Sequence, residues 1–162
     1  MAKDTQDQSM SKPDPALKRL DRLAGTWNMK GKSIGSDEEN IIGTTKFKWL
    51  HEGSGISFFL VQDMDMNYAG NRIKSHEIIG YNPKTKVFSS YVYSNMAPDP
   101  WPYEWEIKGD ALTISIKHGP MDAKFTGKFA PDGNSFSGGW RPNPGADETI
   151  NAPYDITLSR KK

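Results

Sequence analysis

Hydrophobic and polar residues alternate with a period of two along most of this chain, beginning at Thr26. Successive side chains of a strand point to opposite faces, so this period predicts strands with one buried face. In the second of these segments, Phe47 and Trp49 share one face while Lys46 and Lys48 take the other. The predicted strands span Thr26–Ser33, Ile41–Leu50, Ile56–Met64, Ile73–Asn82, Val87–Asn95, Tyr103–Lys108, Ala111–Lys117, Ala123–Ala130, Ser135–Arg141 and Tyr154–Arg160.

Turn-forming sequences separate nearly all of these strands. They include GSDEEN, EGSG, YAGN, NPKT, PDGN and RPNPGADE, which are rich in Gly, Asn, Asp and Pro. The clearest hairpin signal is the two-residue Gly109-Asp110 loop between YEWEIK and ALTISIK. Strands joined by such short turns are antiparallel neighbours.

One short helix precedes the strands, in the sequence DPALKRLDRLAG. Asp14 is a suitable N-cap, Pro15 fits the first helical position, and Gly25 suits a left-handed C-cap. The apolar residues recur at helical spacing: Leu17, Leu20, Leu23 and Ala24. Because these side chains form a stripe, the helix is expected to dock on the sheet.

The predicted fold is all-β: a closed antiparallel up-and-down barrel of about ten strands, with the short N-terminal helix capping one end. Closure removes the exposed sheet edges that so many strands would otherwise leave. A two-sheet sandwich is the alternative. Residues 1–12 are polar and without periodicity, so a disordered tail is expected there. Residues 13–160 are expected to form one barrel domain.

Four features of the chain resemble the lipocalin-like (calycin) barrels. They are Gly25-x-Trp27 after the helix, WLHEGSGISFFL, HEIIGYNPKTKVF, and a basic residue in the last strand. The nearest resemblance is to small bacterial lipocalin-like domains of unassigned function, with a more distant one to nitrobindin-type barrels. It implies that Trp27 closes the floor of the barrel and that Arg160 stacks on its indole.

Haem and metal ions are not expected. The nitrobindin-type resemblance implies a haem-binding histidine near the C-terminus, but no histidine follows His118. No two histidines have the spacing of metal ligands, and no cysteine is present. No cofactor is therefore predicted.

The charge balance argues against several classes of partner. The 162 residues include 21 Lys and Arg and 20 Asp and Glu, for a net charge of +1. Such a chain has no general attraction to nucleic acid or to an anionic membrane. No apolar segment approaches the length that spans a bilayer, and the N-terminus carries no signal-peptide pattern. A cytoplasmic protein is expected, and the sequence leaves a homodimer open.

Aromatic residues are the richest chemical feature and predict a pocket for a small hydrophobic or aromatic molecule inside the barrel. His76 is a candidate polar anchor if its face points inward. Trp101, between two prolines, is a candidate lid over the mouth or a candidate contact for a partner. The predicted wall consists of Phe47, Trp49, Phe58, Leu60, Tyr91, Tyr93 and Trp105.

Two alternative functions stay open at this point. The first is a cofactor-free enzyme, such as a cyclase, isomerase or decarboxylase, acting in the same cavity. It would need an inward titratable group with a shifted pKa: Glu77, Glu104, Glu106 or Tyr93. His76 and Glu77 are adjacent in one strand, so both cannot enter the cavity. The second is a barrel that is filled by its own side chains and binds another protein.

Overall fold

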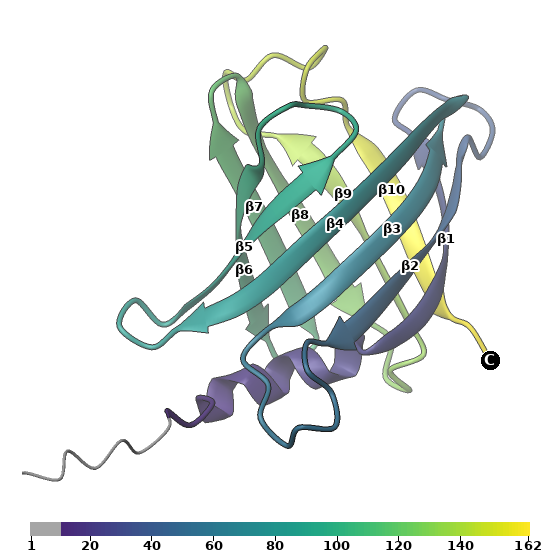
Figure 1. Cartoon of the computed structure of the whole chain (residues 1–162). Coiled ribbons are helices and arrows are strands. Elements are labelled where there is room, and N and C mark those ends of the chain that lie inside the picture. The colour runs from purple at the N-terminus through teal and green to yellow at the C-terminus, as the bar shows by residue number, and fades with distance from the viewer. Residues whose placement is uncertain (1–10) are drawn as a thin grey trace, which may run out of the picture.

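The computed structural model describes residues 11–162, which form ten strands and one helix (Figure 1). Residues 1–10 of the predicted disordered tail lie outside the described residues. The helix is η1 (Pro15–Leu23). The strands are β1 (Gly25–Ser33), β2 (Ile41–Trp49), β3 (Leu60–Tyr68), β4 (Asn71–Asn82), β5 (Val87–Ser94), β6 (Trp101–Lys108), β7 (Ala111–His118), β8 (Met121–Phe129), β9 (Ser135–Pro142) and β10 (Tyr154–Arg160).

The ten strands form a closed antiparallel barrel, as predicted. Each strand pairs with its neighbours in sequence, and β1 pairs with β10 to close the sheet. The closing register sets Trp27 opposite Arg160 and Ser33 opposite Tyr154. Closure excludes the two-sheet sandwich, because no strand edge remains between β1 and β10.

Helix η1 closes one end of the barrel, the lower end in Figure 1. Asp14 caps it as predicted, accepting a hydrogen bond of 2.8 Å from the backbone N–H of Ala16. The helix is of the 3₁₀ type, with three residues per turn, so side chains three apart fall on one line. The buried leucines have this spacing: Leu17, Leu20 and Leu23.

The predicted C-cap was wrong by one residue. Helix η1 ends at Leu23 with Ala24 as its C-cap, and Gly25 already begins β1. Gly25 has a φ of +123°, and a Cβ atom there would lie 2.8 Å from the Nη1 atom of Arg160. The backbone conformation therefore favours glycine at this position, and a larger residue would also displace the Arg160 guanidinium.

One strand boundary differs clearly from the prediction. Strand β3 begins at Leu60 rather than Ile56 and runs on to Tyr68. Residues 50–59 form a loop instead, in which the Leu50 N–H donates to the carbonyl of Phe59. The Ser57 hydroxyl also donates to the carbonyl of Leu50. These local bonds satisfy the backbone that a longer β3 would have paired with its neighbours.

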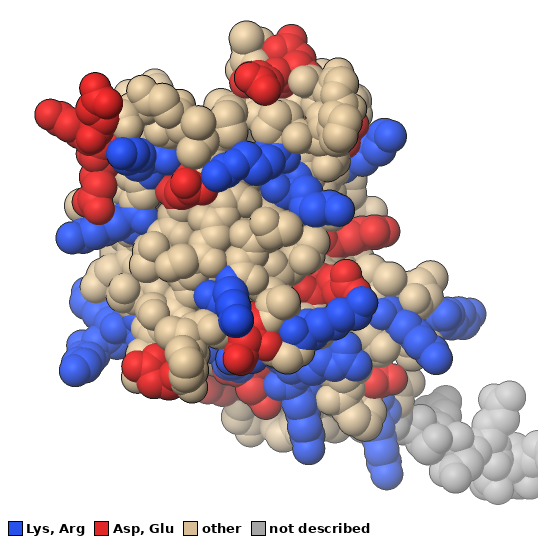
Figure 2. Space-filling view, turned by 180° about the vertical axis from the view of Figure 1, so that it is seen from behind, with Lys and Arg blue, Asp and Glu red and all other residues tan. Residues whose placement is uncertain are grey.

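Charged side chains are spread over the outside of the barrel, with uncharged areas between them (Figure 2). Figure 2 shows Lys and Arg interspersed with Asp and Glu on one face. Ion pairs join neighbouring outer positions, as between Arg72 and Asp65 at 2.6 Å. Within residues 11–162, no helix has the length and apolar character needed to cross a bilayer.

Candidate functional site

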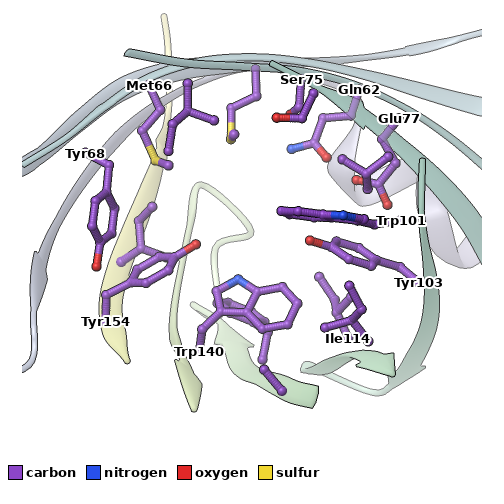
Figure 3. Close-up of a pocket in the computed structure, with 18 of the residues that line it drawn as sticks. Gln62, Met66, Tyr68, Ser75, Glu77, Trp101, Tyr103, Ile114, Trp140 and Tyr154 are labelled. Atoms are coloured by element: carbon purple, nitrogen blue, oxygen red, sulfur yellow. The ribbon is translucent and has the colours of Figure 1, made fainter. Parts of the chain in front are cut away.

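The barrel holds a cavity of about 280 Å³, and most of its lining residues lie on the parts of the strands away from η1. Inward side chains of the strands form its wall (Figure 3). Residues of the loops before β6 and β10 also line it and form its mouth. An apolar cavity of about 150 Å³ is large enough to hold benzene. This cavity therefore has room for a bicyclic aromatic molecule.

The other half of the barrel is filled by its own side chains. Leu20, Leu23, Trp27, Leu60, Ile79, Phe88 and Phe129 are almost fully buried there. The Trp27 indole contacts the ring of Phe136 edge-on at 5.4 Å, and its Nε1 donates to the carbonyl of Leu23. The cavity thus has a solid floor beneath it.

Arg160 packs against this floor and stacks on Trp27, as the family resemblance implied. Its guanidinium lies 4.2 Å from the centre of the Trp27 ring. It also donates hydrogen bonds to the carbonyls of Ala24 and Arg22, at 2.7 and 2.9 Å. The last strand is thereby tied to the end of η1 and to the first strand.

Methionine is concentrated in the cavity. All five methionines of the described residues line it: Met29, Met64, Met66, Met96 and Met121. Methionine side chains are flexible and polarisable, and they make favourable contacts with aromatic rings. They give the wall the capacity to fit ligands of more than one shape.

Aromatic rings form much of the remaining wall. Trp140 contacts Tyr103 and Phe125, with ring centres 5.6 and 5.8 Å apart. Tyr68 contacts Tyr154 edge-on at 5.4 Å. Figure 3 shows the hydroxyls of Tyr103 and Tyr154 directed toward the cavity. Burial raises the pKa of both phenols well above the ordinary value, so both are neutral hydroxyls.

Polar groups gather on one side of the wall, on β3 and β4. Gln62 and Glu77 are register partners on these strands and both face the cavity. Ser75 follows on the same face of β4 (Figure 3). The carboxamide of Gln62 is held by a hydrogen bond of 2.9 Å from its Nε2 to the hydroxyl of Thr45.

Glu77 is the ionisable carboxyl group of the cavity. Its side chain is only 4% exposed. Its Oε1 atom accepts hydrogen bonds from the Ser90 hydroxyl at 2.5 Å and from the Trp105 indole N–H at 2.9 Å. Burial raises the pKa of Glu77 from 4.5 to about 7, although these two hydrogen bonds act in the opposite direction. Glu77 can therefore gain or lose a proton near neutral pH.

Hydrogen bonds hold the loops around the cavity mouth in place. The side chain of Asn151, almost fully buried, donates to the carbonyls of Pro120 and Asp147 and accepts from the N–H of Asp122. This bonding ties the loop before β10 to the β7–β8 turn. The His118 ring at the end of β7 contacts the carboxylate of Asp99, in the loop before β6, at 3.0 Å.

Comparison with known proteins places this barrel in a family. The family described as "Protein of unknown function (DUF1579)" matches residues 12–130, from just before η1 to the end of β8. The chain belongs to the DUF1579 family. No curated protein sequence matches this DUF1579 chain. The crystal structure of Rv2717c from M. tuberculosis resembles it with a TM-score of 0.56 and 13% identity, covering 93% of this chain and 100% of that one. At this identity the likeness shows a shared fold alone.

Two of the residues predicted for the pocket wall of the DUF1579 barrel do line its cavity: Phe47 and Trp105. Three others lie elsewhere, at or near the closed end. Leu60 belongs to the packed floor. Trp49 donates its indole N–H to Asp21 of η1 at 3.0 Å. Phe58 is partly buried in the loop before β3.

The remaining three residues face outward, so the inward direction predicted for Tyr91 and Tyr93 was wrong and the condition set for His76 as a polar anchor is not met. Tyr91 and Tyr93 point to the outside of β5 and are 57% and 52% exposed. His76 also points outward, where its Nδ1 lies 2.6 Å from the carboxylate of Asp63. The strand period fixes which residues share a face, but it does not fix which face is inside. Since His76 points out, its neighbour Glu77 points in.

The candidate titratable groups of the enzyme hypothesis divide in the same way. Glu77 is in the cavity, whereas Glu104, Glu106 and Tyr93 are exposed on the outside. Trp101, the predicted lid residue, lines the mouth. No group of three His, Cys, Asp or Glu side chains within residues 11–162 is arranged to hold a metal ion.

Several cavity residues were not predicted: Gln62, Met64, Met66, Tyr68, Ser75 and Tyr154. Met64, Met66 and Tyr68 alternate with polar residues in QDMDMNY, which is a weak strand signal in the sequence. This alternation continues to Tyr68 and could have extended the strand, but the predicted strand ended at Met64. Gln62 and Ser75 carry no sequence signal, because a polar residue at an inward position resembles one at an outward position.

Proposed function

We propose that this protein binds a small apolar, largely aromatic molecule in the open half of a lipocalin-like barrel. The observation that carries the proposal is the cavity of about 280 Å³ above a packed floor. Its wall combines aromatic rings, methionines and a few polar groups on one side, the usual composition of a small-molecule site. Burying the ligand's apolar surface supplies roughly 25 cal/mol per Å².

The floor supports the lipocalin-like part of the proposal. The resemblance implied a contact between Trp27 and Arg160, and the stacking of the guanidinium on the indole supports it. In such a barrel the floor residues stabilise the fold, and the inward residues nearer the mouth are free to define the ligand.

The test is direct titration with a neutral aromatic probe, 1-naphthylmethanol, followed by its fluorescence and by calorimetry. We expect saturable binding with one site per chain. In Ser75→Trp an indole would occupy the cavity, so binding should be lost. Ser89→Trp is the matched control, because Ser89 is exposed on the outside of the barrel and binding should persist.

Thermal unfolding of both variants establishes that each is folded. Absence of probe binding to the folded wild-type protein would contradict the proposal. Equal binding by wild type and Ser75→Trp would contradict it as well, because the probe would then lie outside the cavity.

A second function is favoured by one specific observation, the buried carboxyl of Glu77. A carboxyl group that is half-protonated near neutral pH is suited to general acid–base catalysis. In the simplest reaction of this kind, Glu77 removes a proton beside a substrate carbonyl and returns it two carbons away, which shifts a double bond without a cofactor. This corresponds to the isomerase form of the enzyme hypothesis.

The conversion of cyclohex-3-enone into cyclohex-2-enone tests this second function. We expect a rate that rises with pH through about 7 and then levels off, because the ionised carboxylate is the base. The rate should fall to background in Glu77→Gln. A rate above background that is the same in the wild type and this variant, or no rate in either, would contradict the isomerase function.

A further inference from the structure

The polar side chains of the cavity lie together on one side of its wall, and this arrangement indicates the class of ligand that the cavity binds. Gln62, Glu77, Val92 and Trp101 form one register row across β3, β4, β5 and β6, and all four face the cavity. Two polar side chains therefore stand side by side at one level of the wall, with an aromatic ring at the end of the row. A ligand bound at this level would meet all of them.

Both polar side chains present a free acceptor oxygen. The Oε1 atom of Glu77 already accepts two hydrogen bonds, from Ser90 and Trp105, which leaves Oε2 for a ligand. The Thr45 hydroxyl donates to the carbonyl of Asp63, so it must accept from Nε2 of Gln62. That orientation turns the carboxamide oxygen of Gln62 away from Thr45.

The free oxygens are accessible from the cavity. Among the described residues, no fully buried side-chain oxygen or nitrogen lacks a hydrogen-bond partner. Oε1 of Gln62 and Oε2 of Glu77 have no partner in the protein and both residues line the cavity, so these atoms are not sealed off. A group that satisfies two neighbouring acceptors must be a hydrogen-bond donor.

The charges around this site favour a positive donor. No Lys, Arg or His is among the residues that line the cavity. The ionisable neighbours on the adjacent strands, Asp63, His76 and Glu104, are exposed on the outer face. The tyrosines facing Glu77, Tyr103 and Tyr154, stay neutral because burial raises the pKa of each. An ionised Glu77 therefore has no positive partner in the cavity wall.

Aromatic faces complete the environment. Trp105 bonds to Glu77 directly, Trp101 lies in the same register row, and Figure 3 shows the rings of Trp101 and Tyr103 on the Glu77 side of the cavity. An ammonium group gains attraction from the faces of such rings in addition to its bond with a carboxylate. A carboxylate ligand would instead meet acceptor oxygens and no positive group.

We propose that the cavity selects an organic cation, a protonated aromatic or alkyl amine, whose ammonium group binds Glu77 and Gln62 against the rings of Trp101 and Tyr103. This inference rests on the proposed binding function and names the ligand class. It also predicts a proton linkage. An ammonium group pairs with the ionised form of Glu77, so binding must release the proton that the empty site holds below about pH 7.

Three probes of nearly the same shape and different charge test the inference on the full chain: 1-naphthylmethylamine, 1-naphthylmethanol and 1-naphthoate. At pH 8 we expect the amine to bind at least about tenfold more tightly than the alcohol, and the acid not to bind. From pH 7 down to pH 5, affinity for the amine should fall by up to about tenfold per pH unit, while affinity for the alcohol stays nearly constant.

Glu77→Gln keeps the acceptor for Ser90 and Trp105 and removes the charge. In this variant the amine should lose its advantage over the alcohol together with its pH dependence. Glu104→Gln, on the outside of β6, should behave as the wild type. Binding of the alcohol with no preference for the amine would overturn the cation inference and leave the binding function intact. Failure of all three probes to bind would contradict the binding function itself.

Discussion

At the scale of single residues, Glu77 is the site where burial and hydrogen bonding oppose each other. Burial favours its protonated form, because an ion loses its hydration in the cavity wall. The bonds from Ser90 and Trp105 favour the ionised form, but they act on only one of the two oxygens. Burial dominates, and the pKa rises to about 7.

This pKa makes the stability of the protein depend on pH. In the unfolded chain Glu77 releases its proton near pH 4.5, and in the folded protein it does so near pH 7. Between these values the folded state holds a proton that the unfolded state has lost. The contribution of Glu77 to the free energy of unfolding is thus largest below pH 4.5. It falls as pH rises to 7, by about 3 kcal/mol in all, and changes no further above that.

Glu77→Gln should remove this pH dependence, because Gln cannot ionise and still accepts the bonds from Ser90 and Trp105. We expect the variant to resemble the wild type at pH 4.5 and to be more stable at pH 8. Urea unfolding at several pH values measures the difference. The exposed Glu104→Gln is the control and should follow the wild-type curve. A wild-type minus Glu77→Gln difference that does not change between pH 4.5 and pH 8 would refute the assignment.

The sequence predicted the alternation of residues better than their direction. In β4, Lys74 and His76 share one face, which favours solvent, but Ser75 and Glu77 make part of the other face polar as well, so the inner face is weakly marked. In β5 the large tyrosines were expected inside, but Ser90, Val92 and Ser94 are the inward residues. A cavity needs small inward residues along part of its wall. The rule that places the largest apolar residues inside therefore fails where a cavity exists.

At the scale of elements, Arg160 of the last strand helps to hold η1 to the barrel, together with the bonds from Trp27 and Trp49. Arg160 donates to two carbonyls at the end of η1 and stacks on Trp27 of β1. The final carbonyls of a helix lack partners within it, so a guanidinium at this place satisfies groups that would otherwise be buried unpaired. Arg160 thus joins three elements that are distant in sequence.

Arg160→Met should destabilise the protein by about 3 kcal/mol, because two charge-assisted hydrogen bonds and the stacking contact are lost. We expect the melting temperature to fall by about 6 to 12 °C for a chain of this size. Arg160→Lys should recover only part of the loss, since one ammonium cannot reproduce the planar fork. Arg72→Met removes an exposed ion pair and serves as the control with a small effect. Equal decreases in melting temperature for Arg160→Met and Arg72→Met would disprove the role of Arg160 in joining η1, β1 and β10.

Elements were predicted more reliably than residue directions. All ten strands and the helix are present, because turn chemistry at sites such as Gly109-Asp110 separates them clearly. The main error was at β3, where Ile56 and Phe58 continue the period of Leu60 although they lie in a loop. Hydrophobic alternation alone cannot distinguish a strand from a loop that packs an apolar side chain.

At the scale of the whole molecule, the barrel has a packed half and a hollow half. The packed half contains η1, Trp27 and the floor residues, and the hollow half contains the cavity. Atoms that line a cavity lack the dispersion contacts that the same atoms would make in a filled core. The hollow half therefore lowers the stability of the free protein, and a bound ligand should restore part of it by mass action.

This division predicts that stability and binding change in opposite directions when the cavity is filled from within. Ala123, on the cavity wall in β8, can be enlarged to Ile, a residue that suits a strand. We expect Ala123→Ile to stabilise the free protein by about 1 kcal/mol, and to weaken 1-naphthylmethanol binding. Thermal unfolding and titration measure the two effects on the same samples.

The matched control is Ala111→Ile, the same substitution at an exposed position at the start of β7. It adds the same carbon atoms outside the cavity, so it should leave probe affinity unchanged. A stabilised Ala123→Ile protein with wild-type affinity would mean that the probe binds elsewhere. A destabilised one would mean that the space beside Ala123 is too tight for three more carbon atoms. A hollow barrel with a ligand-sized interior requires higher stability and weaker probe binding together in Ala123→Ile, and requires that this pair of changes be absent in Ala111→Ile.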